Sequence, residues 1–62
     1  MFLNIQHVIS MDLDEKEGAG KIFHTINFLV GQDTKIKHFD DKDDRNNYFE
    51  KILSGETKWI AI

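Results

Sequence analysis

The sequence predicts a small α+β fold in the order βββαβ: an antiparallel β-meander of about three strands, one helix packed on one face, and a short C-terminal strand. Three observations predict it. Apolar and polar residues alternate over the first part of the chain, the apolar period becomes helical after Phe39, and the last six residues, TKWIAI, form another apolar run. A period of two is typical of strands, and a period of 3.6 is typical of helices. With 62 residues, the chain is expected to form a single domain over residues 1–62.

The first strand is expected within residues 3–13, where apolar and polar residues alternate. Two interpretations fit this segment. It forms either one strand throughout, or a short strand and a longer one separated by a turn at NIQH, residues 4–7. A single strand over the whole segment would be longer than usual, but the sequence leaves both interpretations open.

The second strand is predicted over residues 21–30 and the third over residues 33–39, because both segments alternate and are rich in β-branched and aromatic residues. The polar segment DEKEGAGK joins the first strand to the second. A three-residue loop, Gly31 to Asp33, is preferred between the second and third strands, because a slip of one residue would turn every side chain to the opposite face. The predicted pairs are Val30 with Thr34, Phe28 with Ile36, and Ile26 with His38.

The helix is predicted to begin in the acidic segment DDKDD, residues 40–44, with Asp40 or Asp41 as its N-cap. Asp43 and Asp44 then fall in the first turn, where carboxylates interact favourably with the helix dipole. A calcium-binding loop is the competing interpretation, but no frame supplies both the glycine and the final glutamate that such a loop needs. The four acids and one base of this segment account for the whole formal net charge of −3.

Apolar residues at helical spacing predict a core stripe formed by Tyr48, Phe49, Ile52 and Leu53. Gly55 is expected to end the helix. The helix covers one face of the sheet. We expect that face to carry Ile9, Met11, Ile22, Ile26, Phe28 and Ile36.

The sequence excludes several kinds of site. No cysteine is present, which excludes disulfides and thiolate metal ligands. The segment EGAGK lacks the first glycine and the final serine or threonine of a phosphate-binding loop, and neither serine lies in a nucleophile-elbow motif. We therefore expect no enzymatic activity and no cofactor. The first residues lack signal-peptide features and no apolar run is long enough to span a bilayer, so we expect a cytoplasmic protein without membrane association.

A metal site is one alternative interpretation of the histidines. In the predicted register His24 faces Asp40, and His38 is the diagonal neighbour, so the three side chains could offer two nitrogens and an oxygen to zinc. The favoured interpretation is that each histidine lies at the rim of the core, hydrogen-bonded to backbone or to an aspartate. Asp40 cannot easily cap the helix and bind a metal at the same time.

The predicted function depends on the sheet face that the helix does not cover. This face is expected to be too apolar to remain in water, and a chain this small gains stability from additional core. We therefore expect a non-enzymatic protein-interaction or regulatory module that forms a homodimer through this face or through the C-terminal edge strand, with a different protein as the alternative partner. The candidate interface residues are Val8, Phe23, Leu29, Phe39, Trp59, Ile60 and Ile62.

Single-stranded nucleic-acid binding is the alternative function, through an aromatic and basic sheet face formed by Phe23, Phe39, Lys21, Lys35 and Lys37. The net negative charge and the small number of basic residues argue against it, so nucleic acid is not the expected partner. The layout, FLNIQHVISM followed by a meander and a helix, resembles that of many short bacterial and phage proteins. This resemblance is one of layout and implies no functional residue.

Overall fold

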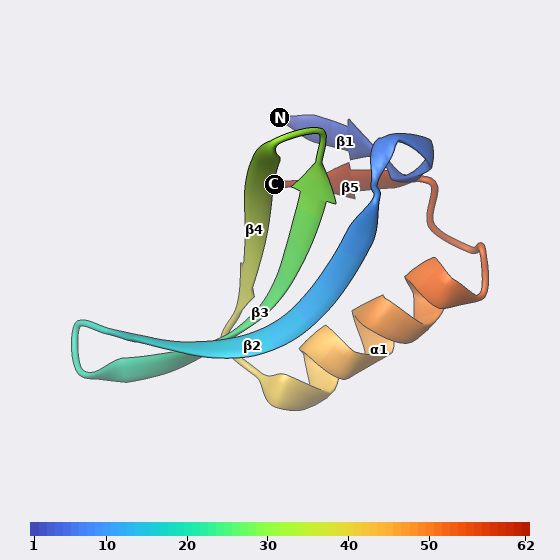
Figure 1. The fold of residues 1–62 in the computed structure, drawn as a ribbon. Coiled ribbons are helices and arrows are strands. Elements are labelled where there is room, and N and C mark those ends of the chain that lie inside the picture. The colour runs from blue at the N-terminus through green and yellow to red at the C-terminus, as the bar shows by residue number, and fades with distance from the viewer.

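The computed structural model describes residues 1–62 and confirms the small α+β fold. Strands β2, β3 and β4 form an antiparallel sheet with β3 in the centre, and β1 pairs with β5 in a separate two-stranded sheet. Helix α1 lies along one face of the larger sheet (Figure 1). The elements are β1 (Phe2–Asn4), a 3₁₀ turn (Ile5–His7), β2 (Ser10–Gly18), β3 (Lys21–Val30), β4 (Asp33–Phe39), α1 (Lys42–Leu53) and β5 (Trp59–Ala61).

The N-terminal segment follows the second of the two interpretations, with a break at NIQH. The Asn4 side chain accepts a hydrogen bond of 2.9 Å from the backbone N–H of Gln6, which starts the 3₁₀ turn and ends β1. The chain then re-enters extended structure as β2. Because of this break, β1 leaves the meander and pairs with β5 from the other end of the chain.

The hairpin between β2 and β3 is long and protrudes from the rest of the molecule (Figure 1). Its register pairs Gly18 with Lys21, so the loop contains only Ala19 and Gly20, both with positive φ. Two positive φ values identify a type I′ turn, the geometry that fits the twist of a hairpin. The arm is two-stranded toward its tip because β4 ends at Phe39, which pairs with His24.

The predicted register between β3 and β4 is wrong by one residue. Val30 pairs with Asp33 across a two-residue loop in which Gly31 has a φ of 63°, as the first position of a type II′ turn requires. Phe28 therefore faces Lys35, and Ile26 faces Lys37, where apolar partners were expected. The prediction failed because lysine can lay its methylene stem along an apolar surface and direct its ammonium group elsewhere.

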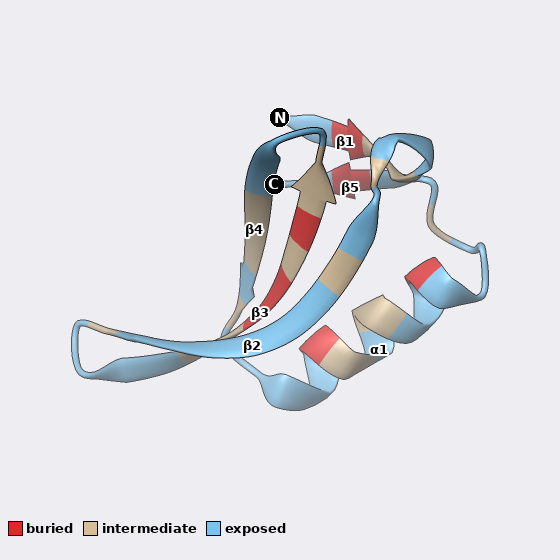
Figure 2. Cartoon of the chain, in the orientation of Figure 1, coloured by how far each residue is buried: buried red, intermediate tan, exposed pale blue.

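The core lies between α1, β3 and the β1–β5 pair (Figure 2). Its five buried hydrophobic residues are Leu3, Ile26, Phe28, Ile52 and Ile60. Among the residues expected under the helix, Met11, Ile26 and Phe28 do contribute to the core. Ile9 is exposed and Ile36 pairs with Asn27 on the opposite face, so these two expectations were wrong. Ile22 lies on the same face of β3 as Ile26 and Phe28, but it is 57% exposed on the hairpin arm.

Helix α1 begins and ends as its sequence predicts. Asp41 is the N-cap and accepts a 2.7 Å hydrogen bond from the N–H of Asp43, while Asp43 and Asp44 lie in the first turn. At the other end Gly55 has a φ of 81°, and the N–H of Glu56 reaches back to the carbonyl of Lys51. This pair of features is a Schellman C-terminus. The helix lacks the length and apolar character needed to cross a bilayer.

The buried stripe of α1 differs from the predicted one at two positions. Ile52 is buried and Tyr48 and Phe49 are half-buried, but Leu53 is 60% exposed. Arg45 is buried instead, one turn before Tyr48 and Phe49. The apolar pattern identified the correct face near Ile52, and it missed the contribution of a long polar side chain to the same face.

Candidate functional site

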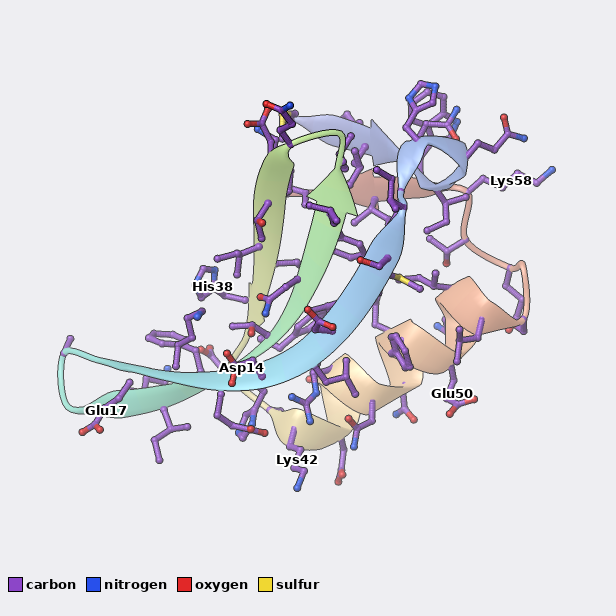
Figure 3. All side chains as sticks on the ribbon, viewed as in Figure 1. Asp14, Glu17, His38, Lys42, Glu50 and Lys58 are labelled. Atoms are coloured by element: carbon purple, nitrogen blue, oxygen red, sulfur yellow. The ribbon has the colours of Figure 1, made fainter.

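The three candidate metal ligands are not brought together. His24 and His38 lie on opposite faces of the sheet, because His24 pairs with Phe39 and His38 pairs with Thr25. The His38 ring packs edge-on against Phe23, with 5.8 Å between ring centroids, on the side of β4 away from α1 (Figure 3). Asp40 instead contacts Lys21, at 3.0 Å between Oδ1 and Nζ. No group of three histidine, cysteine, aspartate or glutamate side chains with metal-binding geometry occurs in the chain.

The aromatic and basic face proposed for nucleic acid is also divided. Lys21 and Phe23 lie on the face away from α1, whereas Lys35, Lys37 and Phe39 pair with β3 residues that face the helix. The cause is the one-residue change in register. The five side chains therefore do not form one surface on which bases could stack.

The Lys37 side chain contacts two aromatic rings and a backbone carbonyl within the fold. Its Nζ lies 5.4 Å from the centroid of the Phe39 ring and 5.3 Å from that of Tyr48. The same Nζ donates a 2.6 Å hydrogen bond to the backbone carbonyl of Ala61. These contacts join β4, α1 and β5, and the cation lies close to two aromatic rings.

A polar cluster joins the start of α1 to the hairpin. Arg45 donates from Nη1 to the carbonyl of Asp14 at 3.1 Å and to the Glu15 carboxylate at 3.3 Å. The Glu15 carboxylate also contacts His24 Nδ1 at 3.4 Å. The hydrogen bond with His24, followed by the charge and hydrogen bond of Arg45, lowers the pKa of Glu15 below its ordinary value of 4.5, although partial desolvation opposes this.

This cluster is suited to holding structure together. Arg45 is almost fully buried and all of its contacts lie within the chain, while Glu15 is half-exposed at the base of the hairpin arm. A buried guanidinium with several acceptors fixes the angle between a helix and a strand.

The predicted interface residues fall into three groups. Ile60 is fully buried, and Val8 and Phe39 are half-buried with side chains packed against the core. Phe23 and Leu29 are half-buried on the sheet face away from α1. Trp59 and Ile62 are exposed, at 60% and 37%, and both belong to the paired chain ends.

The strongest exposed apolar feature is the β1–β5 pair together with Met1 and Ile62, which we call the terminal ribbon. Leu3 and Ile60 pair with each other and are buried, so alternation along the strands turns Phe2 and Trp59 to the opposite, outer side. Phe2 is 72% exposed, more than any other large apolar residue. Sequence reasoning missed Phe2 and Met1. Alternation within MFLN would have found Phe2, because it must face away from Leu3.

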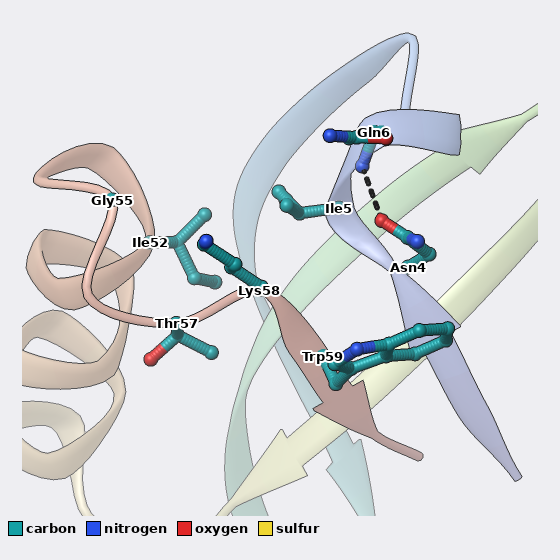
Figure 4. Close-up of a pocket in the computed structure, with 8 residues that line it drawn as sticks. All are labelled: Asn4, Ile5, Gln6, Ile52, Gly55, Thr57, Lys58 and Trp59. Atoms are coloured by element: carbon teal, nitrogen blue, oxygen red, sulfur yellow. Dashed lines mark hydrogen bonds between the residues drawn. The ribbon is translucent and has the colours of Figure 1, made fainter.

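A cavity of about 260 Å³ adjoins the terminal ribbon (Figure 4). It lies between the 3₁₀ turn, the end of α1 and the segment entering β5. Its only ionisable side chain is that of Lys58, and the side-chain Oδ1 of Asn4 already accepts from the backbone N–H of Gln6. Ligand pockets usually start at about 300 Å³, so this cavity is sized for a side chain. Its lining residues are Asn4, Ile5, Gln6, Ile52, Gly55, Thr57, Lys58 and Trp59.

The terminal ribbon is therefore the candidate site, because it combines exposed aromatic side chains, a free strand edge at β1 and an adjoining cavity. Its chemistry suits non-covalent contact with another polypeptide. Comparison of the chain with protein-family models, with curated proteins and with solved structures finds no match.

Proposed function

We propose that the protein is a non-enzymatic protein-interaction module that acts in the cytoplasm as a pair of identical copies joined through the terminal ribbon. The observation that carries the proposal is the exposure of Phe2 and Trp59 on one side of that ribbon. Large aromatic residues are enriched at protein interfaces, and contiguous exposed apolar surface usually marks a contact site. The core supports the same conclusion, because only five hydrophobic residues are buried in the single chain.

The charge distribution is compatible with self-association at this place. The strands of the terminal ribbon, FLN and WIA, carry no charged side chain. The negative charge of the chain is concentrated at the start of α1, which lies at the far end of the helix from β5 (Figure 1). Two copies can therefore approach through their ribbons without bringing the acidic segments together.

The test is the mass in solution, measured by sedimentation equilibrium from a few micromolar to several hundred micromolar. We expect a concentration-dependent dimer. The double variant Phe2→Ala/Trp59→Ala should remain monomeric over the same range. Ile22→Ala, which removes an exposed apolar residue from the hairpin arm, is the matched control and should dimerise as the parent does. A parent chain that stays strictly monomeric, or a control that loses dimerisation equally, overturns the proposal.

A further inference from the structure

The backbone of β1 presents unpaired hydrogen-bonding groups at its outer edge. Ile5 donates to the carbonyl of Lys58, and Ile62 donates to the carbonyl of Met1, so the odd-numbered residues of β1 face β5. Backbone groups alternate in direction along a strand. The N–H and C=O groups of Phe2 and Asn4 therefore point away from β5, and no other strand pairs with β1.

The other free strand edges of the molecule are protected against pairing. Charged side chains occupy much of β2 and β4, the two edges of the larger sheet. The outer edge of β5 is capped, because Lys37 donates to the carbonyl of Ala61. Charges, lysines and covering groups are the devices by which proteins prevent unwanted edge pairing. The charged residues are Asp12, Asp14, Glu15, Lys16 and Glu17 in β2, and Asp33, Lys35 and Lys37 in β4.

The β1 edge has no charge, lysine or covering group, and its short length of three residues is its one protective feature. The segment MFLNIQ contains no charged side chain and no proline, and β1 contains no bulge. Four strand edges are present and three of them are guarded, so the bare one is the place where another strand can add.

We infer that two copies pair antiparallel through their β1 edges and form one continuous four-stranded sheet, β5–β1 of one copy followed by β1–β5 of the other. This inference rests on the proposed function and identifies the contact that joins the copies. Phe2 lies opposite the partner subunit's Asn4, and Leu3 lies opposite the partner subunit's Leu3. This register engages the outward groups of both Phe2 and Asn4 and makes four backbone hydrogen bonds, whereas pairing Phe2 with its own equivalent makes two.

A second copy fits this edge better than an unrelated strand for two reasons. The edge carries no charged side chain, and antiparallel pairing places the two N-terminal amines at opposite ends of the contact. An antiparallel pair of identical strands is also closed by a two-fold axis. The outer-side aromatic residues also become contiguous. Phe2 is the diagonal neighbour of Trp59 within one chain and of the partner's Phe2 across the new edge, at about 7–8 Å, within reach of aromatic side chains.

The proposed contact between the two β1 edges is small, so we expect the affinity of the two copies for each other to be low. A standard interface buries about 800 Å² per partner, about a fifth of the 4341 Å² surface of this chain. Pairing of a three-residue strand with its flanking aromatic residues buries less than that. We therefore expect a weak and reversible dimer, whose population rises with concentration over the range tested.

Cysteine cross-linking tests the register directly, because the chain has no cysteine of its own. The double variant Phe2→Cys/Asn4→Cys keeps Trp59 and the β1 backbone. It should form a covalent dimer with a short bis-maleimide linker at 200 μM, since residues 2 and 4 face each other across the new edge. Loss of the Phe2 ring weakens the association, and the irreversible linker captures the copies that still meet. Asp12→Cys/Asp14→Cys is the matched control. It places two exposed cysteines with the same spacing on β2, an edge strand of the larger sheet, and should give at least tenfold less covalent dimer.

Amide hydrogen exchange provides a second measurement on the unmodified chain. The amides of Phe2 and Asn4 should exchange at least fivefold more slowly at 500 μM than at 5 μM. The amides of Leu13 and Glu17, which point outward from the free edge of β2, should not change. A dimer by mass that shows neither the cross-link nor this protection retains the proposed function and overturns the β1 contact. A strict monomer overturns both, and equal cross-linking of the two cysteine pairs overturns the β1 contact.

Discussion

At the residue scale, Ala19 has the least favourable backbone conformation in the chain. Its φ of 52° makes it the only non-glycine residue with a positive φ. The left-handed region brings Cβ close to the following carbonyl oxygen, which costs about 1–2 kcal/mol. The neighbouring Gly20, with a φ of 72°, completes the turn without that penalty.

Replacing Ala19 by glycine should therefore stabilise the protein. We expect Ala19→Gly to raise the free energy of unfolding by about 0.5–1 kcal/mol, because the gain from relieved strain exceeds the loss from a more flexible unfolded chain. In thermal unfolding this corresponds to a rise in Tm of about 2–8 °C for a chain of this size. The control is Gln32→Gly in the other two-residue turn, where φ is not positive, and it should lower stability. A lower Tm for Ala19→Gly would contradict the strain argument.

Also at the residue scale, the lowered pKa of Glu15 predicts that the stability of the protein depends on pH. Its pKa is lowered in the folded state, chiefly by the hydrogen bond with His24 and then by Arg45. A group whose pKa is depressed by folding contributes stability that is present above its ordinary pKa, 4.5 for Glu15, and is lost as the pH falls through the folded value. The wild type should therefore lose stability below about pH 4.5 more steeply than Glu15→Gln.

Urea unfolding measured between about pH 6 and pH 3 checks this expectation. The midpoints of wild type and Glu15→Gln should differ at the upper end and converge at the lower end. Glu17→Gln, on the exposed hairpin arm and outside any ion pair, is the control and should follow the wild-type curve. Parallel curves for wild type and Glu15→Gln would contradict the assigned role.

At the scale of elements, Arg45 connects α1 to β2. Its side chain is only 4% exposed, and it bonds both the backbone carbonyl of Asp14 and the side chain of Glu15. Asn46 accepts from its Nε at 3.0 Å. The helix thus docks on the sheet by apolar contact near Ile52 and by a directed polar contact near its start.

Arg45→Ala should lower the free energy of unfolding by about 2–3 kcal/mol, because it removes a buried stem and leaves the Asp14 carbonyl without this donor. Chemical denaturation provides the measurement. Lys42→Ala, at an exposed position of the same helix, should change stability by less than about 0.5 kcal/mol. If the two variants are equally stable, the polar contact does not hold the helix.

At the scale of the whole molecule, stability depends on very few residues. Phe28 and Ile26 are fully buried on β3, and they meet Ile52 from α1 and Leu3 and Ile60 from the terminal ribbon. A core of this size supplies about 3–5 kcal/mol of net stability. Replacing one large core side chain by alanine costs about as much free energy as this whole net stability.

Phe28→Ala should therefore leave the isolated chain largely unfolded at room temperature, because the expected loss of about 3–5 kcal/mol matches the whole stability. Far-ultraviolet circular dichroism and one-dimensional NMR would detect this. Ile22→Ala, at an apolar position that is 57% exposed, should keep the native spectrum. A folded Phe28→Ala chain would show that the stability rests elsewhere, for example on the association of two copies.

Features that depend on residues close together in the sequence were predicted correctly, whereas features that depend on distant residues were not. The cap at Asp41, the first-turn carboxylates and the end of α1 at Gly55 were predictable, because each depends on residues within one or two turns. The β3–β4 register was not predictable from apolar pairing, since Lys35 and Lys37 occupy positions that were assigned to apolar residues. Arg45 was missed because its burial depends on acceptors in β2 that are distant in sequence.

The sequence by itself determined the α+β class, the approximate strand and helix segments, the cap and the acidic helix start, because local periodicity and backbone preferences specify these. Tertiary structure alone decided the pairing of β1 with β5, the faces on which His24 and His38 lie, and the exposure of Phe2 beside a bare strand edge. Those features depend on which distant segments meet and on a shift of one residue between strands. A one-residue shift reverses the face of every side chain while leaving the local pattern unchanged.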